Sequence, residues 1–352
     1  MNTHITSSGS YIPTERITNE HFKLAKFLDE QGKPLPLANE AIAQKLFEIT
    51  GIVERRYASP ELLASDMGFF AAKKALENSS TNMEELDYII FAHNFGDVKY
   101  NTSQCDAVPS LASRVKHKLQ IRNPKCVAYD ILFGCPGWIE GVIQAWAYIK
   151  AGMAKKCLVI GGETLSRVVD KHDRDSMIYA DGAGATIIEA SEKTGGILAH
   201  ESASYTYEEV NYLFYGKSYD TKDTSATCYI KMYGRKIYEF ALKYVPQAMK
   251  NCLDKANIPI SKLKKILIHQ ANAKMDEAIV KGFFKLYQMQ VPTDIMPMSI
   301  RNLGNSSVAT IPTLYDLLVK GQLEQHHIQE GDIILFASVG AGMNINAFVY
   351  QC

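Results

Sequence analysis

The sequence predicts an α/β fold made of two related halves, and three observations lead to that prediction. Short apolar segments alternate with stretches of helical spacing, as they do in βαβ units. Similar segments recur in the same order in both halves of the chain, which indicates duplication. The 352 residues are 47% hydrophobic and 22% charged, a composition typical of a globular protein with a large core.

The repeat consists of three pairs of segments. They are "LDYIIFAHN" from 86 and "LKKILIHQAN" from 263, "GCPGWIEGVIQAWAYIKAG" from 134 and "GNSSVATIPTLYDLLVKGQ" from 304, and "DGAGATIIEA" from 181 and "VGAGMNINAF" from 339. This order predicts a first half over residues 1–195 and a second half over residues 196–352, packed together. The first half carries an additional segment at 163–180.

The apolar segments predict the buried strands of both halves. We expect strands at 88–94, 125–131, 156–162 and 185–190, then at 265–270 and 332–338. Glycine and asparagine interrupt the apolar stretch 332–350, so it predicts two strands around a turn and not a membrane span. Residues 24–40 and 205–230 lack the strand and helix patterns, and we expect both to be surface excursions.

Charge and cysteine content exclude several classes of protein. The formal net charge is zero, which argues against a nucleic-acid binder. Seven cysteines are dispersed without a CxxC pair, so a zinc site or redox motif is not expected, and free thiols fit a reducing cytoplasm. The first residues, MNTHITSSGSYIP, lack the pattern of a signal peptide. We therefore expect a cytoplasmic protein.

Cys135 lies between a predicted strand and a predicted helix. Pro136 follows it and suits the first helical turn. The positive end of a helix dipole and free backbone donors favour a thiolate at such a position, which is the reactive form of cysteine. Most cysteines are small buried hydrophobic residues, so the position alone leaves both interpretations open.

The second half supplies two candidate partners for Cys135. Asn305 is its counterpart at the start of the repeated helix, and a pseudo-twofold axis would bring the two helix starts face to face. His269 ends a buried strand, where open α/β sheets gather their active groups. A lone strand-end histidine is usually structural, but the combination of the three indicates a site.

These segments resemble the β-ketoacyl-ACP synthase III family of the thiolase-like superfamily. The matching stretches are "ITGIVERRY" (49–57), "AYDILFGCPGW" (128–138), "GGETLSRVVDKHDRDS" (161–176), "YADGAGATII" (179–188), "IHQAN" (268–272), "GNSSVATIP" (304–312) and "GDIILFASVGAGMN" (331–344). The resemblance covers nearly the whole chain in the family's order. It implies a thiolase-like, five-layered α-β-α-β-α fold, usually a homodimer.

The resemblance also implies catalytic roles. Cys135 would be the nucleophile that takes an acyl group from a thioester. His269 and Asn305 would donate hydrogen bonds to the malonyl thioester and stabilise the enolate as carbon dioxide leaves. The backbone N–H groups of Cys135 and Ala341 would form the oxyanion hole. Neutral donors suffice for this chemistry, and no metal or redox cofactor is called for.

Some positions depart from the family's pattern or concern substrate binding. Lys45 and Ile49 replace a tryptophan and an arginine that clamp coenzyme A, which makes a carrier-protein donor more plausible than acyl-CoA. Arg167 and Lys274 could meet an acidic carrier protein or a phosphopantetheine phosphate, or could be ordinary solvated cations. Asn272, in the IHQAN motif, is a further substrate-binding candidate.

Val108 concerns the length of the acyl chain. It stands in the segment "DAVPSLAS" where the family's common form has a bulky phenylalanine. Removing an aromatic ring would open volume in the pocket. This replacement therefore predicts an acyl chain longer than acetyl.

The implied function is an acyltransferase reaction, the decarboxylative Claisen condensation of an acyl thioester with malonyl-ACP to a 3-oxoacyl-ACP, in fatty acid biosynthesis. The partners would be acyl carrier protein, with acyl-CoA as the alternative donor, and a second copy of the chain. A rival within the family is a secondary-metabolite ketosynthase that joins two fatty-acid-derived intermediates, of the dialkylresorcinol or cyclohexanedione type. Other classes are a thioester hydrolase or acyltransferase, which would consume no malonyl-ACP, and a non-catalytic partner subunit, which would tend to lose the three residues.

Overall fold

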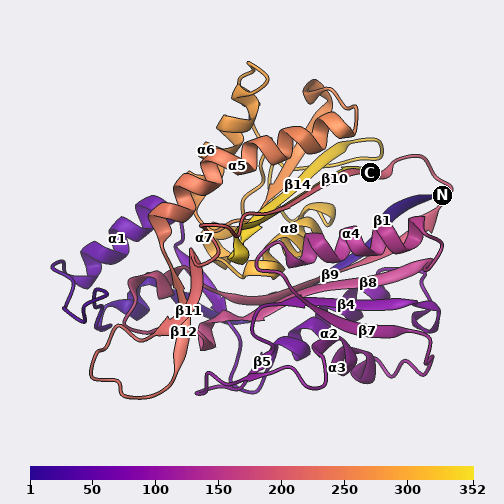
Figure 1. Cartoon of the computed structure of the whole chain (residues 1–352). Helices are drawn as coiled ribbons and strands as arrows, with labels where there is room; N and C mark the ends of the chain where they lie inside the picture. Colours follow the sequence, from indigo (N-terminus) through magenta and orange to yellow (C-terminus); the bar gives the residue numbers. More distant parts are fainter.

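Two mixed β-sheets form the framework of the chain, and the computed structural model describes all 352 residues (Figure 1). The first sheet has the order β1-β9-β8-β4-β7 and the second the order β10-β15-β14-β13. Their bounds are β1 (Asn2–Tyr11), β4 (Tyr88–His93), β7 (Val127–Leu132), β8 (Lys156–Thr164) and β9 (Asp181–Ser191), then β10 (Gly196–Ser204), β13 (Leu263–Ile268), β14 (Ile333–Gly340) and β15 (Asn344–Gln351). These strands confirm all six predicted strand segments.

Helices fill three layers around the two sheets (Figure 1). Helices α2 (Ala64–Glu77) and α3 (Leu111–Lys118) cover the outer face of the first sheet, and α5 (Gly234–Lys255) and α6 (Ala273–Lys285) cover the second. Helices α4 (Gly137–Lys150) and α8 (Thr310–Val319) lie between the sheets and contact both. The layers are therefore α-β-α-β-α, which confirms the predicted fold class.

The central layer holds a core shared by both sheets. Trp138 at the start of α4 lies with its ring centroid 6.1 Å from that of Phe336 on β14. Phe336 in turn stacks on Phe348 of β15 with centroids 4.3 Å apart. Helices α4 and α8 are apolar on most faces, as expected for helices buried on two sides. This packing holds the starts of the two central helices in place.

Shorter elements surround this framework. They are β2 (Glu15–Thr18), α1 (Asn39–Thr50), β3 (Glu54–Tyr57), β5 (Asp97–Val98), β6 (Cys105–Asp106), β11 (Leu213–Lys217), β12 (Cys228–Met232) and α7 (Ile300–Leu303). The segment 24–38 is largely irregular, as predicted, and α1 begins at Asn39. No helix combines the length and the apolar composition that crossing a bilayer requires.

The segment 205–230 corrects one expectation. It is not only a surface excursion, because β11 and β12 pair antiparallel as a hairpin. Leu213 pairs with Met232 and Tyr215 with Ile230, so these four side chains share one face of the hairpin, and all four line a cavity. The polar loop 221–225 between the strands remains exposed. The sequence did not predict this hairpin because a long polar loop separates the two short strands.

The direction of the parallel strands places Cys135 and His269 at the carboxyl ends of strands in the two sheets. Strands β4, β7 and β8 run parallel, and so do β13 and β14. Cys135 follows β7, and His269 follows β13, so each lies at the carboxyl end of a parallel strand. Gly134 has φ +67°, and a methyl group there would lie 2.7 Å from the amide nitrogen of Ala341. The close approach of the two halves therefore requires glycine at this position.

Candidate active site

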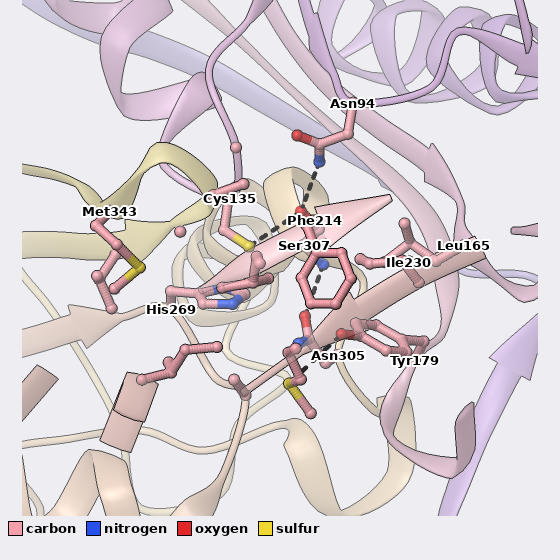
Figure 2. Close-up of a pocket in the computed structure, with 18 of the residues that line it drawn as sticks. Asn94, Cys135, Leu165, Tyr179, Phe214, Ile230, His269, Asn305, Ser307 and Met343 are labelled. Carbon is pink, nitrogen blue, oxygen red and sulfur yellow. Dashed lines mark hydrogen bonds between the residues drawn. The ribbon is translucent and has the colours of Figure 1, made fainter. Parts of the chain in front are cut away.

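A cavity of about 260 Å³ lies where the two halves meet, and 15 of its 21 lining residues are hydrophobic. Cys135, His269 and Asn305 all line it, and Figure 2 shows their side chains around one space. The apolar wall includes Phe95, Leu165, Leu213, Phe214, Tyr215, Ile230, Met232, Met275 and Met343. The structure thus brings the three predicted side chains together beside a surface suited to an aliphatic chain.

The surroundings of the Cys135 thiol favour its protonated form, the opposite of what the helix start alone indicates. Burial raises the pKa of Cys135 to about 11, although the Ser307 hydroxyl donates a hydrogen bond to Sγ at 3.2 Å. The helix start is present, with Pro136 as the N-cap of α4. Desolvation of the sulfur outweighs what the helix end offers, because the low-dielectric cavity disfavours the charged form.

His269 is neutral at physiological pH. Burial lowers the pKa of its imidazole to about 4. Its backbone N–H donates to the carbonyl of Ala337 at 2.9 Å, which extends the pairing of β13 with β14 and fixes the residue. The ring nitrogen Nδ1 has no hydrogen-bond partner. A neutral imidazole with unused hydrogen-bonding capacity can polarise a carbonyl group without carrying charge.

Asn305 is held by backbone and side-chain bonds. Its N–H donates to Ile178 at 3.0 Å, and its carbonyl accepts from Ala180 at 2.8 Å. The side-chain oxygen Oδ1 accepts the backbone N–H of Ser307 at 2.8 Å. Because the oxygen is occupied, Nδ2 is the part of the amide that can donate to a bound molecule.

The turn after β14 lies against the backbone of the nucleophile. A methyl group on Gly340 would lie 2.4 Å from the amide nitrogen of Cys135. Gly340 and Ala341 both line the cavity. This proximity suits a pair of amide donors from Cys135 and Ala341, which stays a prediction.

Asn94, Glu163 and Ser307 lie behind Sγ of Cys135, and they were not identified from the sequence. Nδ2 of Asn94 donates to Ser307 Oγ at 3.0 Å (Figure 2). The same nitrogen donates to Glu163 Oε1 at 2.5 Å. Glu163 is 1% exposed, and burial raises its pKa to about 8. Asn94 follows β4 and Glu163 lies near the end of β8, so the strand-end signal that selected His269 could have found both.

Two predicted binding residues lie elsewhere than expected. Val108 is 87% exposed in the loop between β6 and α3 and does not line the cavity of its own chain, and its effect on acyl-chain length stays a prediction. Arg167 is buried, and its guanidinium donates to the carbonyls of Val98 at 2.6 Å and Ser59 at 3.0 Å. It holds loops together and is not a surface cation for a carrier protein.

The other predicted binding residues lie at the start of α6 and on α1. Asn272 is the N-cap of α6, where its side chain accepts the N–H of Met275 at 3.1 Å. Lys274 is exposed in the first turn of that helix. Lys45 and Ile49 are exposed one turn apart on α1, which contacts α6. Lys45 and Lys274 are therefore accessible to a partner, whereas the side chain of Asn272 is already used to cap α6.

Comparison with known proteins points to one family. The family model described as 3-oxoacyl-[acyl-carrier-protein (ACP)] synthase III matches residues 129–206, and its C-terminal counterpart matches residues 253–352. A β-ketoacyl-[acyl-carrier-protein] synthase III of Neisseria gonorrhoeae is 31% identical over 99% of this chain and 98% of its own length. One of Staphylococcus haemolyticus is 29% identical over 100% of this chain and 99% of its own.

Solved structures agree with the sequence relatives. The 3-oxoacyl-[acyl-carrier-protein] synthase III of Aquifex aeolicus has a TM-score of 0.79 and 29% identity, covering 99% of this chain and 100% of that chain. The synthase III of Thermus thermophilus has a TM-score of 0.81 and 28% identity, covering 99% of each chain. Fold and site together define a condensing enzyme of the acyltransferase class with a thiolase-like architecture. The chain belongs to the β-ketoacyl-ACP synthase III family.

Proposed function

We propose that this enzyme condenses an acyl thioester with malonyl-ACP to give a 3-oxoacyl-ACP, carbon dioxide and a free carrier thiol, in fatty acid biosynthesis. One observation carries the proposal: a thiol from the first half and an imidazole and an amide from the second line the same apolar cavity. A nucleophile beside neutral hydrogen-bond donors is what a two-stage condensation requires.

In the first stage, Sγ of Cys135 attacks the carbonyl carbon of the acyl thioester. The bond from that carbon to the carrier sulfur breaks, and the thiol proton leaves with the carrier. The amides of Cys135 and Ala341 stabilise the negative oxygen of the tetrahedral intermediate. The apolar wall formed by the β11–β12 hairpin receives the acyl chain.

In the second stage, malonyl-ACP occupies the same cavity. The imidazole of His269 and Nδ2 of Asn305 donate hydrogen bonds to its thioester carbonyl and stabilise the enolate that forms as carbon dioxide leaves. The carbanion attacks the acyl group on Cys135, and the sulfur leaves. The pKa of about 4 for His269 supports this role, because a neutral ring donates without needing prior protonation.

The surface supports two kinds of partner. Exposed Lys45 and Lys274 on neighbouring helices suit an acidic acyl carrier protein, which we propose as the donor in preference to acyl-CoA. Strand β7 forms an edge of the first sheet, with Val127 and Leu132 exposed along it. An apolar edge of this kind supports association with a second copy into a homodimer.

Two further proposals concern location and organisation. All seven cysteines are free thiols, which supports a reducing, cytoplasmic location. We place the boundary between two thiolase-like halves at residue 195, in the link between β9 and β10, so that each sheet belongs mainly to one half.

A secondary-metabolite ketosynthase is the second candidate. The exposed positions of Lys45 and Ile49, where a coenzyme A clamp would lie, favour an enzyme that does not prime with acyl-CoA. Such an enzyme would accept a second fatty-acid-derived intermediate in place of malonyl-ACP. Offering both acceptors to the acylated enzyme distinguishes the two candidates by the mass of the product.

Intact mass spectrometry with libraries of acyl-ACP and acyl-CoA tests the proposal. We expect the acyl group on the wild type and on a Cys105→Ala control, and none on Cys135→Ala. His269→Ala and Asn305→Ala should still load but should fail to decarboxylate malonyl-ACP. An acyl group on Cys135→Ala, or equal loss of both half-reactions in the His269 and Asn305 variants, would contradict the assigned roles.

A further inference from the structure

Ser307 occupies an unusual position in the site. Its backbone has φ +52°, a left-handed conformation that non-glycine residues rarely adopt and that often marks functional positions. In this conformation its N–H donates to Oδ1 of Asn305 at 2.8 Å while its hydroxyl donates to Sγ of Cys135 at 3.2 Å. One residue therefore connects the amide that binds substrate to the sulfur that attacks it.

Asn94 determines where the hydroxyl of Ser307 can point. Nδ2 of Asn94 donates to Oγ of Ser307, so this oxygen already accepts a hydrogen bond and its own hydrogen must point elsewhere. The sulfur of Cys135 is the acceptor within reach. If the amide of Asn94 were turned around, its oxygen would attract the serine hydrogen and remove it from the sulfur.

Glu163 determines which way the amide of Asn94 faces. Its carboxyl oxygen Oε1 accepts from the same Nδ2, which holds the amino side of Asn94 toward both Glu163 and Ser307. Glu163 is almost fully buried, and burying a carboxyl group without a purpose is costly. The mechanism proposed above leaves this carboxyl group without a role.

We propose that Ser307 is a further catalytic residue whose hydroxyl stabilises the sulfur of Cys135 when it is negatively charged, and that Asn94 and Glu163 are positioning residues that fix the direction of that hydroxyl. The proposal deepens the proposed function and rests on it. The three side chains form one line of hydrogen bonds from the buried carboxyl group to the nucleophile. Figure 2 shows the part of this line from Asn94 through Ser307 to Cys135.

The Ser307 hydroxyl would stabilise a charged Cys135 sulfur at two steps of the reaction. During loading, the S–H bond of Cys135 and the bond between the acyl carbon and the carrier sulfur break, the bond between the acyl carbon and Sγ forms, and the proton ends on the carrier thiol. During condensation, Sγ is expelled as a thiolate. Ser307 keeps its own proton throughout and donates a hydrogen bond to the charged sulfur in both events.

Other titratable groups share this environment. His269 and Tyr179 line the same cavity, and both stay neutral from pH 6 to 9, since burial lowers the pKa of His269 to about 4 and raises that of Tyr179 well above its usual value. Glu163 lies behind Asn94, and burial raises its pKa to about 8. Because a charged Glu163 would also raise the pKa of Cys135, the variants are compared at pH 6.5, where most of Glu163 is protonated.

The test measures the rate at which iodoacetamide alkylates Cys135, read on the Cys135 peptide by mass spectrometry from pH 6 to 10. Ser307→Gly is the main variant, because glycine accepts φ +52° and keeps the N–H that holds Asn305. We expect alkylation at pH 6.5 and acyl loading to slow by roughly tenfold to hundredfold, the range for a hydrogen bond to a charged group. Malonyl-ACP decarboxylation should remain within about threefold of the wild type, which a general disruption of the site would not allow.

Positioning variants and a control complete the design. Asn94→Ala and Glu163→Leu leave Ser307 in place but undirected, and we expect both to slow alkylation by roughly threefold to thirtyfold. Ser306→Ala, which removes a neighbouring hydroxyl that bonds Thr310, should alkylate like the wild type. Thermal unfolding checks that each variant is folded.

The outcomes separate this proposal from the proposed function. If folded Ser307→Gly alkylates and loads at the wild-type rate, the role of Ser307 is refuted while the condensation function stands. If Asn94→Ala and Glu163→Leu behave like the wild type while Ser307→Gly is slow, the positioning role is refuted. If the wild type takes no acyl group from any donor, the condensation function fails, and the alkylation rates still decide whether Ser307 stabilises the thiolate.

Discussion

The buried ion pair of Lys231 offers the sharpest test of how the cavity wall is held. Lys231 on β12 is 2% exposed, and its Nζ donates to Asp170 at 2.7 Å and to Asp173 at 3.1 Å. Its neighbours in the strand, Ile230 and Met232, line the cavity. Because side chains alternate, the same strand presents its cation to the core and its apolar residues to the substrate.

Asp170 accepts hydrogen bonds from β12 and from the loop that follows β11. Besides Lys231, it accepts the backbone N–H of Tyr219 at 2.7 Å and the hydroxyl of Ser218 at 3.0 Å. Asp170 and Asp173 belong to the segment 163–180, which the second half lacks. The extra segment therefore anchors the hairpin that closes the cavity.

Replacing Lys231 with methionine keeps most of the side-chain volume and leaves two buried carboxylates without their cation. Removing one partner of a buried pair costs about 3–5 kcal/mol of unfolding free energy. Denaturant unfolding of Lys231→Met, Asp170→Asn and the double variant should give a coupling energy of about 1–3 kcal/mol, because the second change removes a carboxylate that the first left unpaired. Arg235→Met, which breaks an exposed pair with Glu239, should cost less than about 0.5 kcal/mol.

The same variant should loosen the cavity wall. We expect Lys231→Met to discriminate less than the wild type among acyl donors from C2 to C14 in single-turnover loading. Effects of the two single changes that add within about 0.5 kcal/mol, or unchanged chain-length discrimination in the folded variant, would refute the anchoring argument.

Three further predictions concern stability, pH and backbone contact. The carboxyl group of Asp276 is buried without a hydrogen-bond partner, and burial raises its pKa well above its usual value, so wild-type stability falls as the pH rises above the unfolded pKa near 4. The unfolding free energy of Asp276→Asn should therefore rise relative to that of the wild type by up to about 1.4 kcal/mol per pH unit. A pH-independent difference in denaturant unfolding would contradict this. Burial raises the pKa of Cys135 to about 11, so the rate of acyl loading in stopped-flow measurements should rise by about tenfold per pH unit from pH 6 to 8. Burial lowers the pKa of His269 to about 4, so the rate of malonyl decarboxylation should not change over this range. A loading rate that has already reached its plateau at pH 6 would indicate a preformed thiolate. Gly340→Ala should slow acyl loading by roughly a hundredfold, because the added methyl group would lie 2.4 Å from the amide nitrogen of Cys135. Gly234→Ala is the control and should load at the wild-type rate, because no atom lies within 4 Å of its methyl group. Equal rates for the two variants would show that the turn can shift without affecting catalysis.

The framework and the three proposed catalytic residues were predictable because their signals are local. Strand segments such as 157–160 carry an unbroken apolar pattern, and the repeat relates the helix starts at Cys135 and Asn305 directly. Strand-end placement selected His269. Each of these features depends on a few neighbouring residues, so a single sequence preserves them.

The anchoring of the cavity wall and the protonation state of Cys135 were not predictable, because both depend on residues far apart in the sequence. Lys231 looks like a surface cation until Asp170, far along the chain, is placed beside it. Arg167 likewise gains its carbonyl partners from other loops. The helix start at Cys135 suggested a thiolate, but the desolvation that outweighs it comes from the assembled cavity. The exposure of Val108 was not predictable either, since a position in a motif does not show which way a loop faces.

One measurement tests the central claim most directly. The wild type is loaded with an isotopically labelled acyl group, unreacted donor is removed, malonyl-ACP is added, and the label and carbon dioxide are followed together. We expect the label to move from Cys135 into a 3-oxoacyl-ACP with one carbon dioxide released for each label transferred. Label released as free acid, or carbon dioxide evolved while the label stays on the enzyme, would contradict a single site in which the two halves of the chain perform one condensation.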